Sequence, residues 1–156
     1  MMRRTEKEIV DKDVIEEILA KSEICRIAMT DGDEAYIVPL NYGYSENVIY
    51  MHSAPEGRKM KILKSNNKVC FEIEYSSEIK RNKVPCKWTT KYRSLIGYGR
   101  VEIITDLENK KRGLDIIMSK YGETSRLGYD EILLDRLVVL SLKIDKITGK
   151  QSGIWD

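Results

Sequence analysis

Residues 24–52 read ICRIAMTDGDEAYIVPLNYGYSENVIYMH, and this stretch decides the fold. Residues 24–30, 35–44 and 48–52 have the composition of short strands, and the turn sequences Asp31-Gly32-Asp33 and Ser45-Glu46-Asn47 separate them. Pro39 cannot donate a hydrogen bond to a sheet, so the middle strand is expected at an edge, at a bulge or beside a ligand. Short strands joined by tight turns predict an antiparallel meander.

The sequence on either side of this meander adds three strands and three main helices. Strands are predicted at 68–75, 92–104 and 137–147, and helices at 11–21, 57–65 and 106–121, with a short helix around 130–134. Gly97 and Gly99 permit sharp curvature of the long strand 92–104. Residues 76–90 are polar and basic and are expected to be irregular. These segments predict a mainly β fold with α additions, a six-stranded antiparallel β-barrel with flanking helices.

Composition limits the function classes. The 156 residues suit one domain (1–156), and 27 basic against 25 acidic side chains give a net charge of +2, too balanced for bulk nucleic-acid binding. Cys25, Cys70 and Cys86 show no CxxC spacing, which argues against a disulfide framework or structural zinc. No signal-peptide pattern or membrane-spanning stretch is evident, so a cytoplasmic protein is expected.

The densest group of polar residues is His52-Ser53-Ala54-Pro55-Glu56-Gly57-Arg58-Lys59, between a strand and a helix. Free N–H groups at a helix start, with Ser53, Gly57, Arg58 and Lys59 nearby, suit a phosphate monoester. The alternative is a solvated basic helix. His52 is the only histidine, so it is a poor metal ligand and is either a proton donor or a strand-end residue bonded to backbone.

Two further segments could contact a planar ligand. Residues 38–44 (Val38, Pro39, Leu40 and Asn41, then Tyr-Gly-Tyr) could pair with the polar edge of a heterocycle, or they could be an ordinary edge strand. Trp88, Arg93 and Ser94 could stack on a ring and contact phosphate, or they could lie at a subunit interface.

Nucleophile and nucleotide motifs are missing from the sequence. It contains no GxSxG, HExxH, P-loop or GxGxxG pattern. If the protein is an enzyme, a cofactor is therefore expected to supply the chemistry.

The order and spacing of these three segments resemble the Nim-type 5-nitroimidazole resistance proteins, within the wider pyridoxamine 5′-phosphate oxidase-like, FMN-binding split-barrel group. The resemblance runs from the first helix to Gly149-Lys150. Met51 stands where the motif usually has an aromatic residue, and the tail 152–156 lies beyond the match. The extra basic residues that true pyridoxamine-phosphate oxidases carry near the C-terminus are not found, which disfavours that specific activity.

The resemblance implies a homodimeric split barrel that binds FMN in two equivalent sites between the subunits. Val38, Pro39, Leu40 and Asn41 would lie along the flavin ring, and Ser53, Gly57, Arg58 and Lys59 would hold the phosphate. Trp88, Arg93 and Ser94 would lie near the site, with some contacts from the second subunit. His52 would stand close to the flavin or substrate and is the candidate catalytic residue. No metal is implied.

The leading hypothesis is an FMN-dependent reductase of a small organic acceptor such as a nitroimidazole. The alternative is a non-catalytic module that holds FMN, haem or deazaflavin for storage or sensing. Neither hypothesis includes a nucleic acid or a membrane as a partner.

Overall fold

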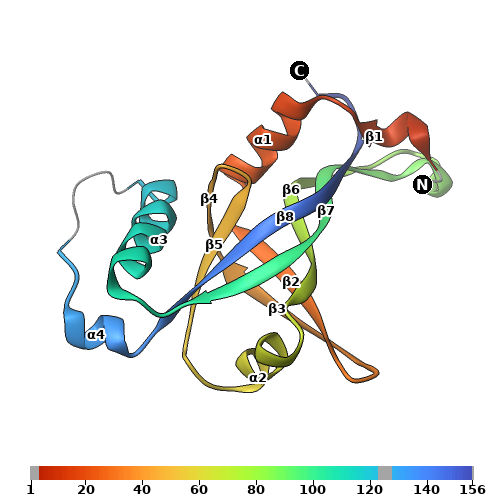
Figure 1. Cartoon of the computed structure of the whole chain (residues 1–156). Coiled ribbons are helices and arrows are strands. Elements are labelled where there is room, and N and C mark those ends of the chain that lie inside the picture. Colours follow the sequence, from red (N-terminus) through yellow and green to blue (C-terminus); the bar gives the residue numbers. More distant parts are fainter. Residues whose placement is uncertain (1–3, 123–127, 156) are drawn as a thin grey trace.

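The structure is a computed structural model that describes residues 4–122 and 128–155 (Figure 1). Its strands are β1 (Glu8–Ile9), β2 (Ile24–Asp31), β3 (Glu34–Asn41), β4 (Gly43–Ser45), β5 (Val48–Ser53), β6 (Lys68–Lys80), β7 (Thr89–Ile104) and β8 (Val138–Ser152). Its α-helices are α1 (Lys12–Lys21), α2 (Arg58–Ser65), α3 (Leu107–Lys120) and α4 (Glu131–Asp135), and the short 3-10 helices are Thr5–Lys7 and Pro85–Lys87.

The strands form one antiparallel sheet in the order β3-β2-β6-β7-β8-β5-β4, with β1 beside β8. The sheet curls until β3 contacts β5, although the two strands are not hydrogen-bonded neighbours in the sheet order. The prediction of a mainly β, antiparallel barrel with flanking helices is therefore confirmed. The described part of the sheet has eight strands rather than six, because β1 is added and the predicted strand 35–44 divides into β3 and β4.

The division falls at Tyr42 rather than at Pro39. The Tyr42 ring is fully buried, and its hydroxyl donates a 2.8 Å hydrogen bond to the Leu19 carbonyl oxygen in α1. Pro39 stays inside β3 opposite Arg26, and the edge position of β3 explains why its missing N–H is tolerated.

Two helices close the ends of the barrel. Ile18 and Leu19 of α1 are buried at one end, and Met60, Ile62 and Leu63 of α2 are buried at the other. Both helices start where the sequence predicted; Asp11 caps α1 by accepting a hydrogen bond from the Asp13 N–H. The third helix, α3, packs beside β4 and β5 (Figure 1).

Alternating side chains of β6 and β7 fill the interior. Val69, Phe71 and Ile73 point inward from β6, as their spacing predicts. A Cβ at Gly97 of β7 would lie 2.2 Å from Cζ of Phe71, so the glycine makes room for the buried ring. The register between β7 and β8 shifts at Tyr98/Gly99, which bends the sheet at the glycine pair that the sequence indicated.

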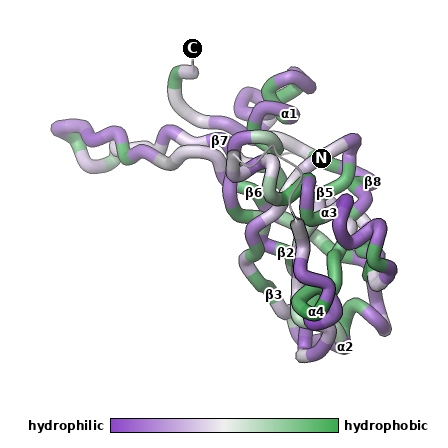
Figure 2. Tube along the Cα trace, turned by 90° about the vertical axis from the view of Figure 1, so that its left-hand side faces the viewer, coloured by the Kyte–Doolittle hydropathy of each residue, from purple (hydrophilic) through white to green (hydrophobic). Residues whose placement is uncertain are grey.

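The prediction of an irregular segment at 76–90 is wrong at both of its ends, whereas residues 81–88 lie outside the strands. The sheet continues to Lys80 in β6 and restarts at Thr89 in β7, and the two strands pair outside the barrel as a projecting hairpin (Figure 2). A ribbon exposed on both faces needs no apolar alternation, which explains why periodicity did not reveal it.

The cysteines are unpaired. Cys25 is buried, Cys70 is half-buried and Cys86 is exposed. Burial raises the pKa of the Cys25 thiol to about 12, so it behaves as a small apolar side chain, as predicted. No described helix has the length and apolar character needed to cross a membrane.

Candidate functional site

His52 and Ser53 lie at the end of β5 and point to opposite sides of it. His52 is exposed, whereas Met51 and Ser53 on either side are buried. The Ser53 hydroxyl donates a 2.9 Å hydrogen bond to the Ala54 carbonyl oxygen. His52 is thus the outward-facing side chain at this end of the barrel, free to meet a ligand outside it.

Gly57 turns the chain into α2. Its φ of 106° is in the region that favours glycine, and its carbonyl oxygen accepts the first helical hydrogen bond from the Lys61 N–H. The backbone N–H groups of the first helical turn, including those of Arg58 and Lys59, point toward the N-terminal end of α2. The helix has no carbonyl four residues earlier to accept hydrogen bonds from them.

Arg58 is held by the turn between β2 and β3. Its Nε donates to Asp31 Oδ2 at 3.2 Å, its Nη2 donates to Glu34 Oε2 at 2.8 Å, and its guanidinium carbon lies 4.7 Å from the centroid of the Tyr36 ring. These carboxylates raise the pKa of Arg58. Asp31 and Glu34 thus hold the Arg58 guanidinium in place next to the start of α2.

Lys59 is half-buried, and among the described residues it makes no ion pair. Burial lowers its pKa, and no carboxylate counteracts that effect. A partly desolvated ammonium without an anion, beside a helix start and an arginine, is a good match for a phosphate group.

Residues 38–41 form the free edge of the sheet. Val38 and Leu40 pack inward against the core, whereas Pro39 and Asn41 are exposed. Because β3 ends the sheet order, alternate backbone groups here face away from β2 and can bond a ligand. The Asn41 amide donates to the Tyr121 hydroxyl, which donates in turn to the Glu23 carbonyl oxygen, each at 3.0 Å.

Trp88, Arg93 and Ser94 form the third group of predicted site residues, after residues 52–59 and 38–41. Trp88 lies on the projecting hairpin, is 50% exposed, and donates its indole N–H to the Asn82 carbonyl oxygen at 2.6 Å. Arg93 is buried: it contacts Glu17 at 3.3 Å and Gln151 at 3.1 Å, and lies 4.3 Å from the Trp155 ring. Ser94 follows it on β7, opposite Glu74 and Lys150. Successive side chains on a strand point to opposite faces, so Arg93 and Ser94 do not face the same ligand.

The structure brings the first two groups together and keeps the third apart. His52 of β5 lies opposite Val139 of β8, which in turn lies opposite Ile104 at one end of β7. Arg93 precedes Ile104 by eleven residues on β7. At about 3.3 Å per residue, the two positions are roughly 35 Å apart. Within one chain, therefore, Arg93 and Trp88 cannot share a ligand with His52 and Lys59.

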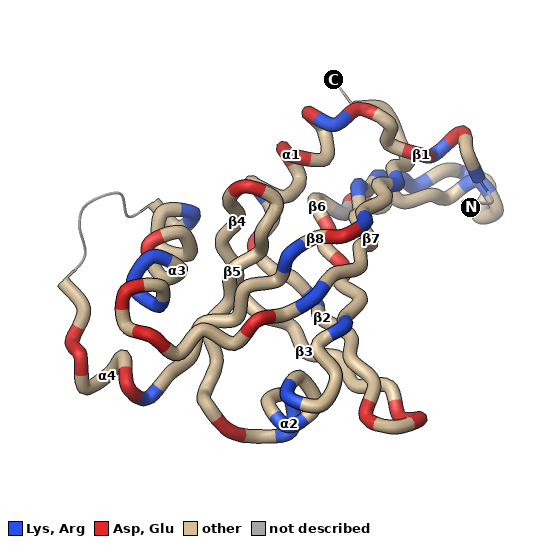
Figure 3. The backbone as a smooth tube through the Cα atoms, viewed as in Figure 1, with Lys and Arg blue, Asp and Glu red and all other residues tan. Residues whose placement is uncertain are grey.

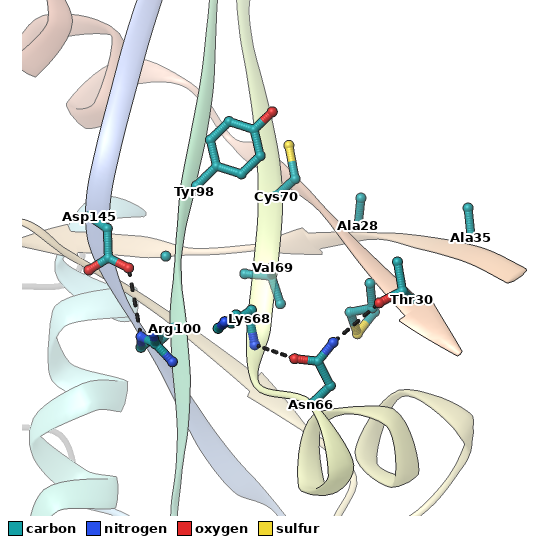
Figure 4. A pocket seen from close by; sticks show the side chains of 12 residues that line it. Ala28, Thr30, Ala35, Asn66, Lys68, Val69, Cys70, Tyr98, Arg100 and Asp145 are labelled. Atoms are coloured by element: carbon teal, nitrogen blue, oxygen red, sulfur yellow. Dashed lines mark hydrogen bonds and ion pairs between the residues drawn. The ribbon is translucent and has the colours of Figure 1, made fainter. Parts of the chain in front are cut away.

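A shallow groove of about 410 Å³, which no sequence pattern indicated, lies on the outer face of the sheet (Figure 4). Small side chains form its floor, flanked by Tyr98, Lys68 and Arg100; the lining also includes Ala28, Thr30, Ala35, Asn66, Cys70 and Asp145. Arg100 and Asp145 approach to 4.0 Å at its rim. The outward-facing residues mix polar and apolar types, so only the register of three strands reveals the groove.

Among the described residues, no group of three or more His, Cys, Asp or Glu side chains is placed to hold a metal ion. The curled antiparallel sheet, with helices closing its two ends, defines a split-barrel protein. The profile of the pyridoxamine 5′-phosphate oxidase family matches residues 11–151, and the chain belongs to that family.

Solved structures agree with this assignment. A proposed 5-nitroimidazole antibiotic resistance protein from Bacteroides thetaiotaomicron is 33% identical, with a TM-score of 0.81, over 92% of this chain and 85% of that one. Two others share the fold at 19% identity: the flavocytochrome Anf3 from Azotobacter vinelandii (TM-score 0.84; 100% and 75% of the two chains) and the FAD- and haem-binding protein from Mycobacterium smegmatis (0.83; 96% and 75%).

A protein of Rhizobium meliloti (strain 1021), itself uncharacterized, is 33% identical over 70 residues. The match spans 44% of this chain and 46% of that protein.

Proposed function

We propose that this protein binds FMN between the subunits of a homodimer and reduces a small organic acceptor such as a nitroimidazole. Family membership and the 33% identity to a proposed nitroimidazole resistance protein support this proposal. The observation that carries it is the half-buried, unpaired Lys59 beside Arg58 at the start of α2.

The phosphate of FMN would bind at this helix start. Lys59 would give its ammonium, Arg58 would add charge from the position that Asp31 and Glu34 fix, and Ser53 and Gly57 would shape the backbone around the phosphate. A phosphate supplies the anion that Lys59 lacks in the described chain.

The flavin ring would lie along residues 38–41. Glu34, which Arg58 contacts, precedes Val38 by four residues of β3, or about 13 Å. The ribityl chain of FMN would cross that interval, so the phosphate site and the edge strand fit one ligand. Pro39 and Asn41 are the exposed side chains there, and Tyr121 fixes the Asn41 amide.

A second copy would complete the site. Trp88, Arg93 and Ser94 lie too far from His52 in their own chain, so they can contribute only to the partner's site. Trp88 is the most accessible of the three; Arg93 is largely covered by Glu17, Gln151 and Trp155.

FMN, when bound, supplies the electron transfer between a reduced donor and the acceptor. His52, which points outward at the end of β5, would donate a proton to the acceptor. The three free cysteines are consistent with the proposed location of the protein in the reducing cytoplasm.

A non-catalytic cofactor carrier is the second candidate, favoured by the fold shared with a flavocytochrome and an FAD- and haem-binding protein. The absorbance spectrum of the purified protein, followed by titration with FMN, FAD and haem, separates the two. Tight FMN uptake and turnover with reduced nicotinamide support the reductase. A Soret band, or no flavin uptake, would reject it.

A further inference from the structure

A small pocket opens where the end of α3 meets α1 and β4. Its volume is about 180 Å³, and the residues that line it are Ala20, Tyr44, Ile116, Ser119 and Lys120. Figure 3 shows α1 and α3 on either side of β4, and both helices contact that strand. Since a water molecule takes about 30 Å³ in the liquid, the pocket has room for roughly six atoms of that size.

Lys120 is the one charged side chain in the lining, and it is half-buried. Its ammonium donates a hydrogen bond to the Leu19 carbonyl oxygen and lies over the face of the Tyr42 ring. None of the carboxylates that the structure describes forms an ion pair with it. A carbonyl oxygen and an aromatic face replace only part of the hydration of a charge, so this site favours the neutral amine.

The surroundings make Lys120 a better nucleophile than a surface lysine. Burial lowers its pKa to about 8, although Cys25 and Glu23 act in the opposite direction. At pH 7 about one molecule in ten then carries the free amine, compared with about one in three thousand for a lysine of pKa 10.5. The neutral amine has the lone pair that attacks a carbonyl carbon, and desolvation is one way in which proteins activate a lysine for this reaction.

Two hydroxyl groups line the pocket together with the amine. The Tyr44 hydroxyl donates a 2.9 Å hydrogen bond to Glu16 Oε1, and the Ser119 hydroxyl donates a 3.0 Å hydrogen bond to the Ile116 carbonyl oxygen. Each hydroxyl oxygen keeps lone pairs that can accept a further hydrogen bond from a ligand. The Tyr44–Glu16 pair can therefore take up a proton from the amine during attack and return it to a departing hydroxyl.

The lining also selects the kind of electrophile. Ala20 and Ile116 are apolar, and no arginine or second lysine of the described chain lines the pocket to pair with a carboxylate or phosphate. The volume admits a chain of a few heavy atoms and excludes a ring system as large as a flavin. A short, uncharged aldehyde has the size, the polarity and the electrophilic carbon that this pocket requires.

We propose that Lys120 is a covalent capture site for short uncharged aldehydes, which it binds as an imine in the pocket between α1, β4 and α3. The amine nitrogen forms a bond to the aldehyde carbon, and the carbonyl oxygen takes one of the two amine protons to become a hydroxyl. That hydroxyl leaves with the second amine proton as water, so one amine and one aldehyde give one imine and one water. No oxidant or reductant is consumed, and the reaction needs neither FMN nor a second subunit.

Reductive trapping with propanal tests the site. Sodium cyanoborohydride converts an imine into a stable secondary amine, and peptide mapping by mass spectrometry locates it. At pH 7, Lys120 should be labelled at least tenfold faster than Lys64, an exposed lysine of α2 in the same molecule. Lys120→Arg should lose the fast label and keep the slow labelling at Lys64. Equal labelling of Lys120 and Lys64 in the wild type overturns the proposal.

Two further measurements separate a built pocket from a merely reactive amine. Ala20→Leu, at an exposed position of α1, should fill the pocket and slow the labelling of Lys120 at least fivefold, with Lys64 unchanged. Glyoxylate, an aldehyde of similar size that carries a carboxylate, should label Lys120 more slowly than propanal does. An unchanged rate in Ala20→Leu, or a preference for glyoxylate, contradicts the proposal.

The pH profile gives an independent signature. Labelling of Lys120 should rise to a plateau above about pH 8, whereas labelling of Lys64 should still increase at pH 9. Burial raises the pKa of both Cys25 and Tyr44 to about 12, so these neighbours keep their protons across this range. Parallel profiles for the two lysines would show that the pocket does not activate Lys120.

Discussion

The ammonium of Lys120 lies 3.2 Å from the centroid of the Tyr42 ring and donates a 3.0 Å hydrogen bond to the Leu19 carbonyl oxygen, which also accepts from the Tyr42 hydroxyl. Lys120 is the last residue of α3, so this contact ties α3 to α1 and to the bend between β3 and β4. Burial lowers the pKa of Lys120 to about 8.

Alkaline pH should therefore stabilise the protein through Lys120. The unfolded chain keeps this lysine protonated to about pH 10.5, whereas the folded chain releases the proton above about 8, so stability rises between those values. Below about pH 8 the folded and unfolded chains both keep the proton on Lys120, so stability does not depend on pH through this group. The melting temperature of wild type relative to Lys120→Met should increase from pH 8 to 10, by an amount equivalent to about 1 kcal/mol for this half-buried group. Lys111→Met is the control, and a parallel pH profile for both variants would contradict the assignment.

Lys59→Gln should weaken FMN binding by about 1.5–3 kcal/mol, or roughly 10- to 100-fold in Kd, because it removes one charge-assisted contact to phosphate. Isothermal titration calorimetry of the purified protein measures this. Lys64→Gln, an exposed lysine of the same helix, should bind FMN like wild type. Riboflavin, which lacks the phosphate, should not distinguish the two variants. Equal FMN affinity of Lys59→Gln and wild type removes Lys59 from the site.

His52→Ala should leave FMN affinity within about twofold and slow reduction of the acceptor. The side chain is exposed, so its loss should change the free energy of unfolding by less than about 0.5 kcal/mol. Stopped-flow measurement of flavin reoxidation by a nitroimidazole, with and without added imidazole, separates proton donation from binding. Unchanged reoxidation in the variant would reject the role of proton donor.

Gly97→Ala should destabilise the fold by about 1–3 kcal/mol, since the new methyl group overlaps the Phe71 ring and lies 2.9 Å from the Lys146 carbonyl oxygen. Chemical denaturation of the variant measures the loss, and Phe71→Leu in the same background should recover part of it. Gly128→Ala, where nothing lies within 4 Å of the added carbon, should be close to neutral. A Gly97→Ala protein as stable as wild type would mean that Phe71 repacks freely.

Local patterns predicted most of the barrel. The strict alternation of Val69, Phe71 and Ile73, and the turn sequences around Gly32 and Asn47, specify inward faces and hairpins without knowledge of the whole fold. The strand-to-helix junction 52–59 was likewise visible, because His52, Gly57 and the basic residues are close in sequence.

Contacts between distant segments could not be read from the sequence. Arg58 meets Asp31 and Glu34 only because the β2–β3 hairpin folds toward α2. The tail beyond Lys150 also lacked an interpretation, yet Gly153, at a φ of 89°, turns it so that Trp155 covers Arg93. Such pairings depend on the path of the whole chain, and local periodicity does not contain that information.

The length of β7 has a consequence for genetics. If each ligand site takes Lys59 from one chain and Trp88 from the other, then a Lys59 variant and a Trp88 variant are both inactive as homodimers. Their heterodimer carries one site with both defects and one with neither. Random reassortment would restore about a quarter of all sites, so two loss-of-function alleles expressed in one cell would complement each other.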